Sequence, residues 1–303
     1  MITIFIAIAP VFLLIMTGYG LRRGGIPSTE FWNLNDKLVY WVLMPALFFA
    51  KISAADLTSP EIWSLAIVLY VGFFAAIACG WFLGRRWRAK DASSILQGSA
   101  RFNTFIGLSL AEALFGASGL QTAVLGSALL IPVVNIMVVS LLSQQLGSGR
   151  GGLLGELARN PLILSIIAGV GFNLAGWNEV PVLHEFARIL GNAALPIMLM
   201  CVGANLKIRG LQGDALAIIA ATVGKFVIFP SGVLLALALL QPAPLTAEVA
   251  IIFAALPTGV AAYTLARQMG GNAPLMAAVI TVQTLLSFVT LPVTLTLARA
   301  FIG

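Results

Sequence analysis

The stretches Arg101-Phe-Asn-Thr-Phe-Ile-Gly107 and Leu256-Pro-Thr-Gly-Val260 place polar, glycine and proline residues inside two long apolar segments. At membrane depth, such an interruption releases backbone N–H and C=O groups from helical hydrogen bonds, and a buried ligand can then bind them. The two stretches lie at matching places in the two halves of the chain. The sequence therefore predicts that two membrane helices break, at about residues 102–108 and 255–260. We expect the two breaks to meet near mid-membrane and to form one ligand site.

The composition places the chain in a membrane. Of 303 residues, 60% are hydrophobic and 9% are charged, whereas soluble domains carry about 25% charged residues. Apolar windows of about 20 residues, each long enough to span a bilayer, recur along the chain. We expect ten transmembrane helices, over residues 2–21, 32–53, 61–84, 92–116, 119–146, 160–177, 182–206, 214–240, 246–268 and 273–301. The first is too long for a removed signal peptide and lacks its basic region and cleavage site, so we expect it to stay in the membrane.

Basic residues fall mainly on one set of alternate connections between these helices. They give the chain a net charge of +6, and basic loops stay in the cytoplasm. We expect the cytoplasmic connections near residues 22–30, 85–91, 147–159, 207–213 and 270. Both termini then lie outside the cytoplasm, as in a multi-pass protein of the inner membrane. The basic run at 85–90 is a topology signal, and no nucleic-acid partner is expected.

A shift of 151 residues superposes prolines and glycines of the two halves. The matched pairs are Pro10 with Pro161, Gly18 with Gly169, Gly20 with Gly171, Gly25 with Gly176 and Pro45 with Pro196, and one more residue of shift matches Gly107 with Gly259 and Gly119 with Gly271. This excess of matches indicates a duplication, with the glycine-rich segment 147–152 as its junction. Each half holds five spans, and an odd number inserts the second half with the opposite orientation. The sequence thus predicts two inverted repeats.

Several of these segments resemble motifs of the auxin efflux carrier family. Asn103-Thr-Phe-Ile-Gly-Leu108, continued by Ala113-Leu-Phe-Gly116, resembles the fourth helix of the family, and Leu256-Pro-Thr-Gly259 with Ala266 resembles the ninth. Lys225-Phe-Val-Ile-Phe-Pro230 resembles the eighth helix, and Leu291-Pro-Val-Thr294 resembles the tenth. The resemblance covers the whole chain and has two departures. Ser109 stands where many members have proline, and the large cytoplasmic loop of the plant exporters is absent. The second departure favours a bacterial member of the family.

The resemblance implies a fold similar to that of sodium/proton antiporters and bile-acid transporters, in which helices four and nine break and cross near the midplane. It assigns residues 1–58 and 160–210 to scaffold helices, residues 60–146 and 214–301 to a transport domain, and residues 147–159 to a cytoplasmic linker. Family substrates are mostly small carboxylates, including auxin and malonate. A homodimer through the scaffold helices is a further expectation.

Residues at the two interruptions are the main candidates for substrate binding. They are Asn103, Thr104 and Gly107 at the first, and Pro257, Thr258, Gly259 and Tyr263 at the second. Each has a structural alternative, because asparagine also bonds neighbouring membrane helices, proline and glycine also produce simple kinks, and tyrosine often only packs. The position of Asn103 beside Gly107 and within the family motif favours the site.

Charged residues within the predicted spans are candidates for the substrate path or for coupling. Arg101 either lines that path or extends to the cytoplasmic surface, since an arginine inside the membrane costs about 2.5–3.5 kcal/mol and usually faces protein or water. Lys225, in the middle of the eighth span, either takes part in coupling or pairs with a carboxylate or a helix end. Glu112, Asp36 and Lys37 are candidates for coupling or gating, with a position at the membrane surface as the alternative.

Other polar residues add two binding candidates and no metal site. Asn135 and Gln283 lie at span midpoints beside the expected crossing, and we include them among the substrate-binding residues. Cys79, Cys201 and the single histidine, His184, form no metal-ligand pattern, so we expect neither a metal nor a cofactor. Nucleotide-binding loops and hydrolase motifs are missing from the sequence, which argues against an enzyme.

The sequence favours a secondary transporter that moves a small organic anion across the bilayer by an elevator-type motion. A passive channel or a membrane-embedded sensor with the same fold is the alternative. No predicted helix carries a continuous polar stripe, which favours the carrier over the channel. An intramembrane enzyme is the least favoured reading, because no paired carboxylates or Ser/Lys dyad share one helix face.

Overall fold

The computed structural model describes residues 2–147, 155, 159–208 and 214–302, and every regular element within these ranges is a helix. The α-helices are α1 (Ile2–Arg23), α2 (Thr29–Leu38), α3 (Met44–Ser53), α4 (Pro60–Gly84), α5 (Ala89–Ala100), α6 (Thr104–Leu146), α8 (Pro161–Leu174), α9 (Leu183–Ala204), α10 (Ala215–Val223), α11 (Phe229–Leu240), α12 (Pro244–Ala255), α13 (Ala261–Gln268) and α14 (Ala273–Ile302). Two π-helical turns, η1 (Val39–Leu43) and η3 (Gly224–Ile228), precede Pro45 and Pro230 and continue into α3 and α11.

Six helical stretches of the described chain are long and apolar enough to cross a membrane. They are Ile4–Arg23, Pro60–Gly84, Ala89–Leu146, Leu183–Ala204, Ala215–Leu240 and Ala273–Ala300. The predicted class, an all-helical multi-pass membrane protein, is confirmed. The number of ten transmembrane helices stays a prediction, because the spans expected at 32–53, 160–177 and 246–268 appear as shorter helices. The expected junction and linker within 147–159 lie largely outside the described residues.

The stretch Ala89–Leu146, of 58 residues, is not one straight helix. Residues 101–103 between α5 and α6 are not helical, and Gly116 inside α6 has φ +63° and ψ −149°. Only glycine adopts this backbone conformation without strain, because it has no Cβ. α6 therefore consists of two helices that meet at Gly116, where the sequence predicts that one span ends and the next begins.

Side-chain caps begin several of the helices. Ser59 and Asn160 each precede a proline at the first helical position and accept a hydrogen bond from a backbone N–H of the first turn. Proline is favoured there because its missing N–H would have no helical partner. Asp214 caps α10 by accepting from Leu216 N, and Asn103 caps α6. Polar residues at these positions thus mark the helix starts that the apolar windows alone leave undefined.

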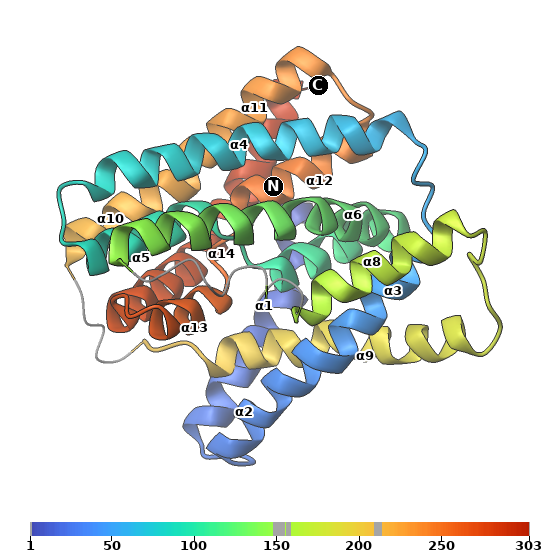
Figure 1. The fold of residues 1–303 in the computed structure, drawn as a ribbon, viewed down its shortest axis with the longest axis horizontal. Helices are drawn as coiled ribbons and strands as arrows, with labels where there is room; N and C mark the ends of the chain where they lie inside the picture. Colours follow the sequence, from blue (N-terminus) through green and yellow to red (C-terminus); the bar gives the residue numbers. More distant parts are fainter. Residues whose placement is uncertain (1, 148–154, 156–158, 209–213, 303) are drawn as a thin grey trace.

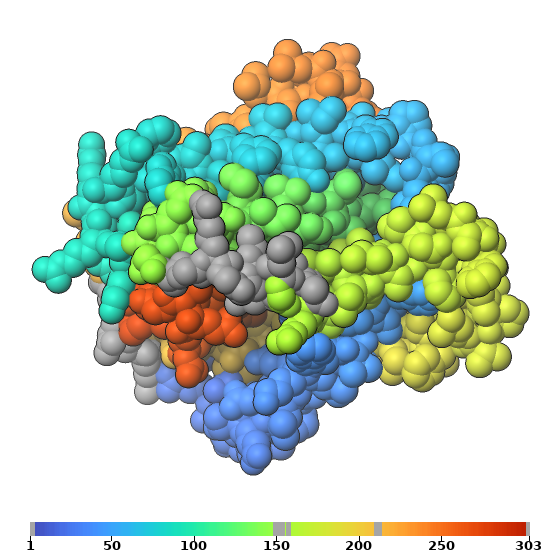
Figure 2. All heavy atoms as spheres, viewed as in Figure 1, coloured from blue at the N-terminus to red at the C-terminus, as the bar shows by residue number. Residues whose placement is uncertain are grey.

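The helices form two groups that meet along α6, α1 and α14. In one group, α1 packs on α9, and α3 packs on both α8 and α9. In the other, α4 packs on α5 and α11, while α5 also contacts α10, α13 and α14. Figure 1 shows α2, α3, α8 and α9 on the lower and right side, with α4, α5, α10 and α11 on the upper and left side. Figure 2 shows the same arrangement as filled atoms, with α4 above and α2 below.

Two turns related by the shift of 151 residues have the same geometry. Gly25 and Gly176 end their helices with φ +72° and +74°. Ile26 N donates to Leu21 O, and Trp177 N donates to Phe172 O, both at 2.9 Å. The same shift relates Phe49 to Met200, and a Cβ added at Gly18 would collide with the Met200 backbone, while one added at Gly169 would touch Phe49 O. These matches support a duplication, and its inverted orientation stays a prediction.

Hydrogen bonds join several of the connections that the sequence assigns to the cytoplasm. Asp214 Oδ2 accepts from Trp87 Nε1 at 2.5 Å, and Asp91 Oδ1 accepts from Asn272 Nδ2 at 2.6 Å. The bond from Trp87, followed by the Leu216 amide, holds the pKa of Asp214 below its ordinary value. The connections near residues 85–91, 214 and 272 therefore lie at one end of the molecule, as one shared membrane side requires. Arg150 and Arg209, two of the basic residues, lie outside the described ranges.

Candidate functional site

The first helix break lies at residues 101–103, between the end of α5 and the start of α6. The sequence places this break at 102–108, and the prediction is wrong for 104–108, which are helical. The reason is the cap that Asn103 forms, because its Oδ1 accepts from Phe105 N and Ile106 N, each at 3.2 Å. A capping asparagine starts a new helix at the next residue. Thr104 and Gly107 consequently lie in the first turns of α6, where Thr104 is half-buried.

The second break lies at residues 256–260, between α12 and α13, so the predicted range of 255–260 is confirmed except at Ala255, which is helical. Pro257 has no N–H to donate, and the residue before a proline is disfavoured in a helix. Leu256 accordingly has extended backbone angles, φ −69° and ψ 142°. All residues from Leu256 to Gly259 are buried.

The two breaks are in direct contact. The backbone N–H of Asn103 donates to Pro257 O at 2.8 Å. A Cβ added at Gly259 would lie 2.7 Å from Phe102 O, and one added at Gly107 would lie 2.7 Å from Leu256 Cδ1. Contacts this short essentially never occur for a real Cβ. The approach requires glycine at position 259, where the neighbour is a backbone atom, whereas at position 107 the neighbour is the end of a leucine side chain that can move. Gly107 and Gly259, which match under the shift of 152 residues, thus both lie at the contact between the breaks.

Gln283 of α14 connects the second break to the last turn of α5, which leads into the first break. Its Oε1 accepts from Thr258 N at 3.0 Å, and its Nε2 donates to Gly98 O at 3.0 Å. Thr258 Oγ1 donates to the same carbonyl of Gly98 at 2.8 Å. All three residues are completely buried or nearly so. A network of three chain segments therefore satisfies two backbone groups that the breaks release, Thr258 N and Gly98 O.

Two buried donors at the first break have no partner among the residues that the structure describes. They are Nδ2 of Asn103, which is 1% exposed, and Nη1 of Arg101. The other guanidinium nitrogen of Arg101, Nη2, donates to Asn135 Oδ1 at 2.7 Å, which fixes the side chain. A buried donor without an acceptor is costly. Both groups donate only, so the missing partner is an acceptor, and a carboxylate would bind them best.

The structure also holds a buried amide that the sequence analysis missed. Gln97 of α5 is completely buried, and neither Nε2 nor Oε1 has a partner in the described chain. It lies one helical turn before Arg101, whose backbone N–H donates to Gln97 O at 2.9 Å. A glutamine inside a predicted span, one turn before an arginine, is the signal that could have identified it.

Lys225 does not join this network. Its side chain is completely buried, and its Nζ has no hydrogen-bond partner in the described residues. The Nζ atom lies 4.1 Å from the centre of the Phe229 ring, one helical turn away, in a cation–π arrangement. The carboxylate partner that the sequence analysis considered is thus not observed within the described residues.

The remaining candidates lie outside the two breaks, and Tyr263 is the nearest in the chain, since its N–H donates to Val260 O at 3.0 Å. Tyr263 is half-buried and packs under Lys207 Nζ, which lies 4.8 Å from the ring centre. Asp36 Oδ2 accepts from Asn205 Nδ2 at 2.8 Å. Within the described chain Asp36 forms no ion pair with Lys37, which is exposed, as is Glu112. The same residues contain no group of three His, Cys, Asp or Glu side chains that could hold a metal ion.

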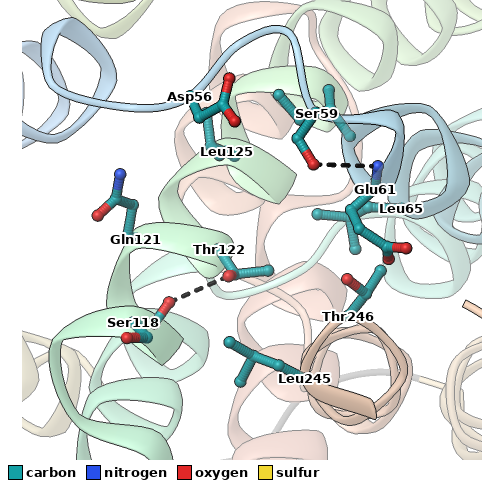
Figure 3. A pocket seen from close by; sticks show the side chains of 11 residues that line it. Asp56, Ser59, Glu61, Leu65, Ser118, Gln121, Thr122, Leu125, Leu245 and Thr246 are labelled. Atoms are coloured by element: carbon teal, nitrogen blue, oxygen red, sulfur yellow. Dashed lines mark hydrogen bonds between the residues drawn. The ribbon is translucent and has the colours of Figure 1, made fainter. Parts of the chain in front are cut away.

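A separate cavity of about 230 Å³ opens at the start of α4, beside α6 and the start of α12. Figure 3 shows polar side chains around it, including Asp56, Glu61 and Gln121. Glu61 Oε2 also accepts from Ala243 N at 3.1 Å, which ties α4 to the loop before α12. The lining residues are Asp56, Ser59, Glu61, Ile62, Leu65, Ser118, Gln121, Thr122, Leu125, Leu245 and Thr246. None of the predicted site residues lines this cavity.

The chain is similar to known transport proteins along its whole length. A family model described as membrane transport protein matches residues 3–152 and 150–295. A Rhizobium meliloti protein named "Putative malonate transporter" is 28% identical over 309 residues, covering 97% of this chain and 95% of that protein. An uncharacterized transporter of Methanothermobacter thermautotrophicus is 24% identical over 93% of this chain and 94% of its own. One of Methanocaldococcus jannaschii is 24% identical over 73% and 75%.

Proposed function

Because the chain belongs to the membrane transport protein family, which is the auxin efflux carrier family that its motifs resemble, we propose that it is a secondary transporter of a small organic anion. The observation that carries this proposal is the pair of buried donors, Asn103 Nδ2 and Arg101 Nη1, that have no partner within the described ranges. A carboxylate that accepts hydrogen bonds from both would satisfy these donors and offset the charge of the guanidinium. Charge-assisted hydrogen bonds of this kind are about twice as strong as neutral ones.

The helix ends at the breaks add to the positive potential. α6 and α13 both begin there, and the N-terminus of a helix carries about half a positive charge. Two helix C-termini, those of α5 and α12, also end at the breaks. Gly98 O of α5 accepts from Thr258 and Gln283, and Pro257 O after α12 accepts from Asn103 N. Both negative ends are thereby partly neutralised, which favours an anion at the crossing.

The transport motion that we propose is elevator-like. The scaffold comprises residues 1–58 and 160–210, and the moving domain comprises residues 60–146 and 214–301, joined through the linker 147–159. The two helix groups support this division, because α1, α3, α8 and α9 pack mainly on one another. The breaks belong to the moving domain, so the bound anion would travel with it between the two faces of the membrane.

Malonate is our first substrate candidate, because the Rhizobium meliloti relative carries malonate in its name. Gln97 would add a donor for a second carboxylate one helical turn from Arg101. Lys225, Glu112, Asp36 and Lys37 keep their proposed coupling or gating roles. Of these, Lys225 has the strongest support, since a lysine buried without an acceptor is costly and usually functional. We also propose an inner-membrane location with both termini outside the cytoplasm, and a homodimer through the scaffold.

Counterflow in proteoliposomes tests this function. Vesicles containing the purified protein are loaded with unlabelled malonate, and the uptake of labelled malonate and of indole-3-acetate is measured. A carrier gives saturable uptake that internal malonate stimulates. Uptake that rises linearly and ignores internal malonate would support the channel instead. Absence of any carboxylate uptake and of any carboxylate binding would contradict the proposed function.

A further inference from the structure

Gln283, predicted from the sequence as a substrate ligand, contacts the second break at Thr258 and the last turn of α5, directly before the first break, at Gly98. Its Oε1 and one Nε2 proton are already engaged by Thr258 N and Gly98 O. We propose that Gln283 is a positioning residue, which fastens the two breaks to each other and to α14 and so holds the free donors of Asn103 and Arg101 in register. This role rests on the proposed transport function, and it assigns to Gln283 no contact with the substrate.

The amide of Thr258 explains why an acceptor is needed at this position. Thr258 lies in the non-helical segment after α12, where its N–H has no helical partner, and it is 0% exposed. No water can replace a partner at such a buried site without a polar cavity. Gln283 Oε1 is the acceptor that the described structure provides, at 3.0 Å.

The carbonyl of Gly98 explains why a donor is needed on the same side chain. In a continuous helix, Gly98 O would accept from Phe102 N, but α5 ends at Ala100 and Phe102 lies in the break. Thr258 Oγ1 and Gln283 Nε2 take its place. Gly98 also allows the close packing that this requires, because a Cβ there would lie 2.7 Å from Val279 Cγ1 of α14.

An amide side chain is the group that can satisfy both needs at once, since it carries an acceptor and a donor at its tip. Together with the bond from Asn103 N to Pro257 O, Gln283 and Thr258 link α5, α12 and α14 across the crossing. The break that carries Arg101 and Asn103 is consequently attached to its neighbour at two places. A binding site that moves with its domain requires such attachment, because a displacement of about 1 Å already weakens binding.

The test compares Gln283→Met, which has a similar volume and no hydrogen bonds, with Thr284→Val as a matched control. Thr284 is buried on the same helix, and its Oγ1 has no partner in the described chain. In folded, monodisperse protein, the dissociation constant for malonate is expected to rise at least about tenfold in Gln283→Met and less than about twofold in Thr284→Val. Thr258→Val should also weaken binding, and Thr258→Ser should restore it because the hydroxyl donor returns.

Non-additivity separates positioning from direct contact. Gln283 and Thr258 share Gly98 O, so the double variant Gln283→Met with Thr258→Val should bind malonate no more than about threefold more weakly than the worse single variant. If the two effects instead multiply, or if Gln283→Met binds like the parent, the positioning role is wrong. If Gln283→Met changes which carboxylates bind while the hydrogen exchange of both breaks stays as in the parent, Gln283 is a direct ligand. That result would also contradict the positioning role.

Hydrogen exchange without any substrate keeps the role of Gln283 distinguishable from the proposed function. Peptides covering residues 98–107 and 255–262 should exchange at least about tenfold faster in Gln283→Met than in Thr284→Val, while peptides of α9 stay unchanged. Equal exchange in the two variants contradicts the positioning role. Faster exchange in a protein that binds no carboxylate would keep that role and reject the transport function.

Discussion

The break at residues 101–103 holds two buried hydrogen-bond donors that have no partner in the described chain. At the break at 256–260, the carbonyl of Pro257 and the N–H and hydroxyl groups of Thr258 all have hydrogen-bond partners. Asn103 Nδ2 and Arg101 Nη1 are free. Pro257 O accepts from Asn103 N, and Thr258 N and Oγ1 bond to Gln283 and Gly98. The first break is therefore suited to bind a ligand, and the second is suited to hold the first in place.

This difference shows how two halves with matched glycines can take different roles. Gly107 and Gly259 are equivalent under the shift of 152 residues, and each permits a close approach to the opposite break. The residues beside them differ: Asn103 and Arg101 precede Gly107, whereas Pro257 and Thr258 precede Gly259. A site built in this way can bind a single anion asymmetrically, with its charge toward one half of the molecule.

Replacing Arg101 should produce the largest effect on the first break. Arg101→Ala removes a charge-assisted donor worth about 1.5–3 kcal/mol, which corresponds to about ten- to hundredfold in the dissociation constant for malonate. Arg101→Lys should recover little of this, because one ammonium cannot replace a planar fork that bonds Asn135 with Nη2 and leaves Nη1 for the ligand. Isothermal titration of both variants measures the effect, and Arg23→Lys, which alters an exposed arginine bonded to Tyr19, is the control.

Recovery of full affinity in Arg101→Lys would show that the residue supplies only electric field. The first break would then offer one specific donor in place of two, and the contrast with the second break would be weaker.

Gly259→Ala should have the next largest effect, because it pushes the two breaks apart. The new methyl group would meet Phe102 O at 2.7 Å, and a backbone atom cannot move aside without displacing the break. Overpacking of this kind costs about 1–3 kcal/mol, so we expect malonate uptake at a subsaturating concentration to fall about tenfold. Parent-like uptake in a stably expressed Gly259→Ala protein would show that the breaks need not touch.

Gly107→Ala should be milder than Gly259→Ala. Its methyl group would meet only the Cδ1 atom of Leu256, which is the flexible end of a side chain. We expect uptake within about threefold of the parent, since a leucine can adopt another rotamer at a cost of about 1 kcal/mol. A larger loss than in Gly259→Ala would reverse the order of the two contacts.

Side-specific labelling sharpens the comparison of the two halves without altering the site. Ser28 and Glu179 are related by the shift of 151 residues, follow the matching turns at Gly25 and Gly176, and are exposed. In a protein without Cys79 and Cys201, a cysteine at position 28 should react with a membrane-impermeant maleimide only from the cytoplasmic side, and one at position 179 only from the outside. Reaction of both from one side would contradict the inverted repeat.

The sequence predicts the membrane class and the second break well, because both depend on local properties. Apolar windows fix the class through their length, and Pro257 prevents a regular helix through its missing N–H. The first break is predicted too far along the chain, because Gly107 suggests that the interruption continues to that residue. In the structure, the Asn103 cap starts α6 at Thr104. Cap chemistry could have placed it, because asparagine is a preferred residue before a helix.

The roles of individual site residues depend on tertiary contacts that a single sequence does not contain. Gln283 and Gly98 are 185 residues apart, and their bond exists only because α14 packs on α5. The same holds for Arg101 with Asn135. Lys225 shows the opposite case, because sequence analysis considers a carboxylate partner and the structure places an aromatic ring beside it.

The central claim is that Asn103 Nδ2 binds a carboxylate, and titration of Asn103→Asp with malonate tests it most directly. The aspartate keeps an oxygen that can cap α6, so the helix start is preserved, but the N–H donor becomes a repelling oxygen. Asn160→Asp is the matched control, because Asn160 caps α8 in the same way, accepting from Leu162 N and Ile163 N. We predict that Asn103→Asp raises the dissociation constant for malonate about ten- to hundredfold, while Asn160→Asp leaves it unchanged. Equal malonate affinity of Asn103→Asp and the parent would contradict the claim and place the anion elsewhere in the protein.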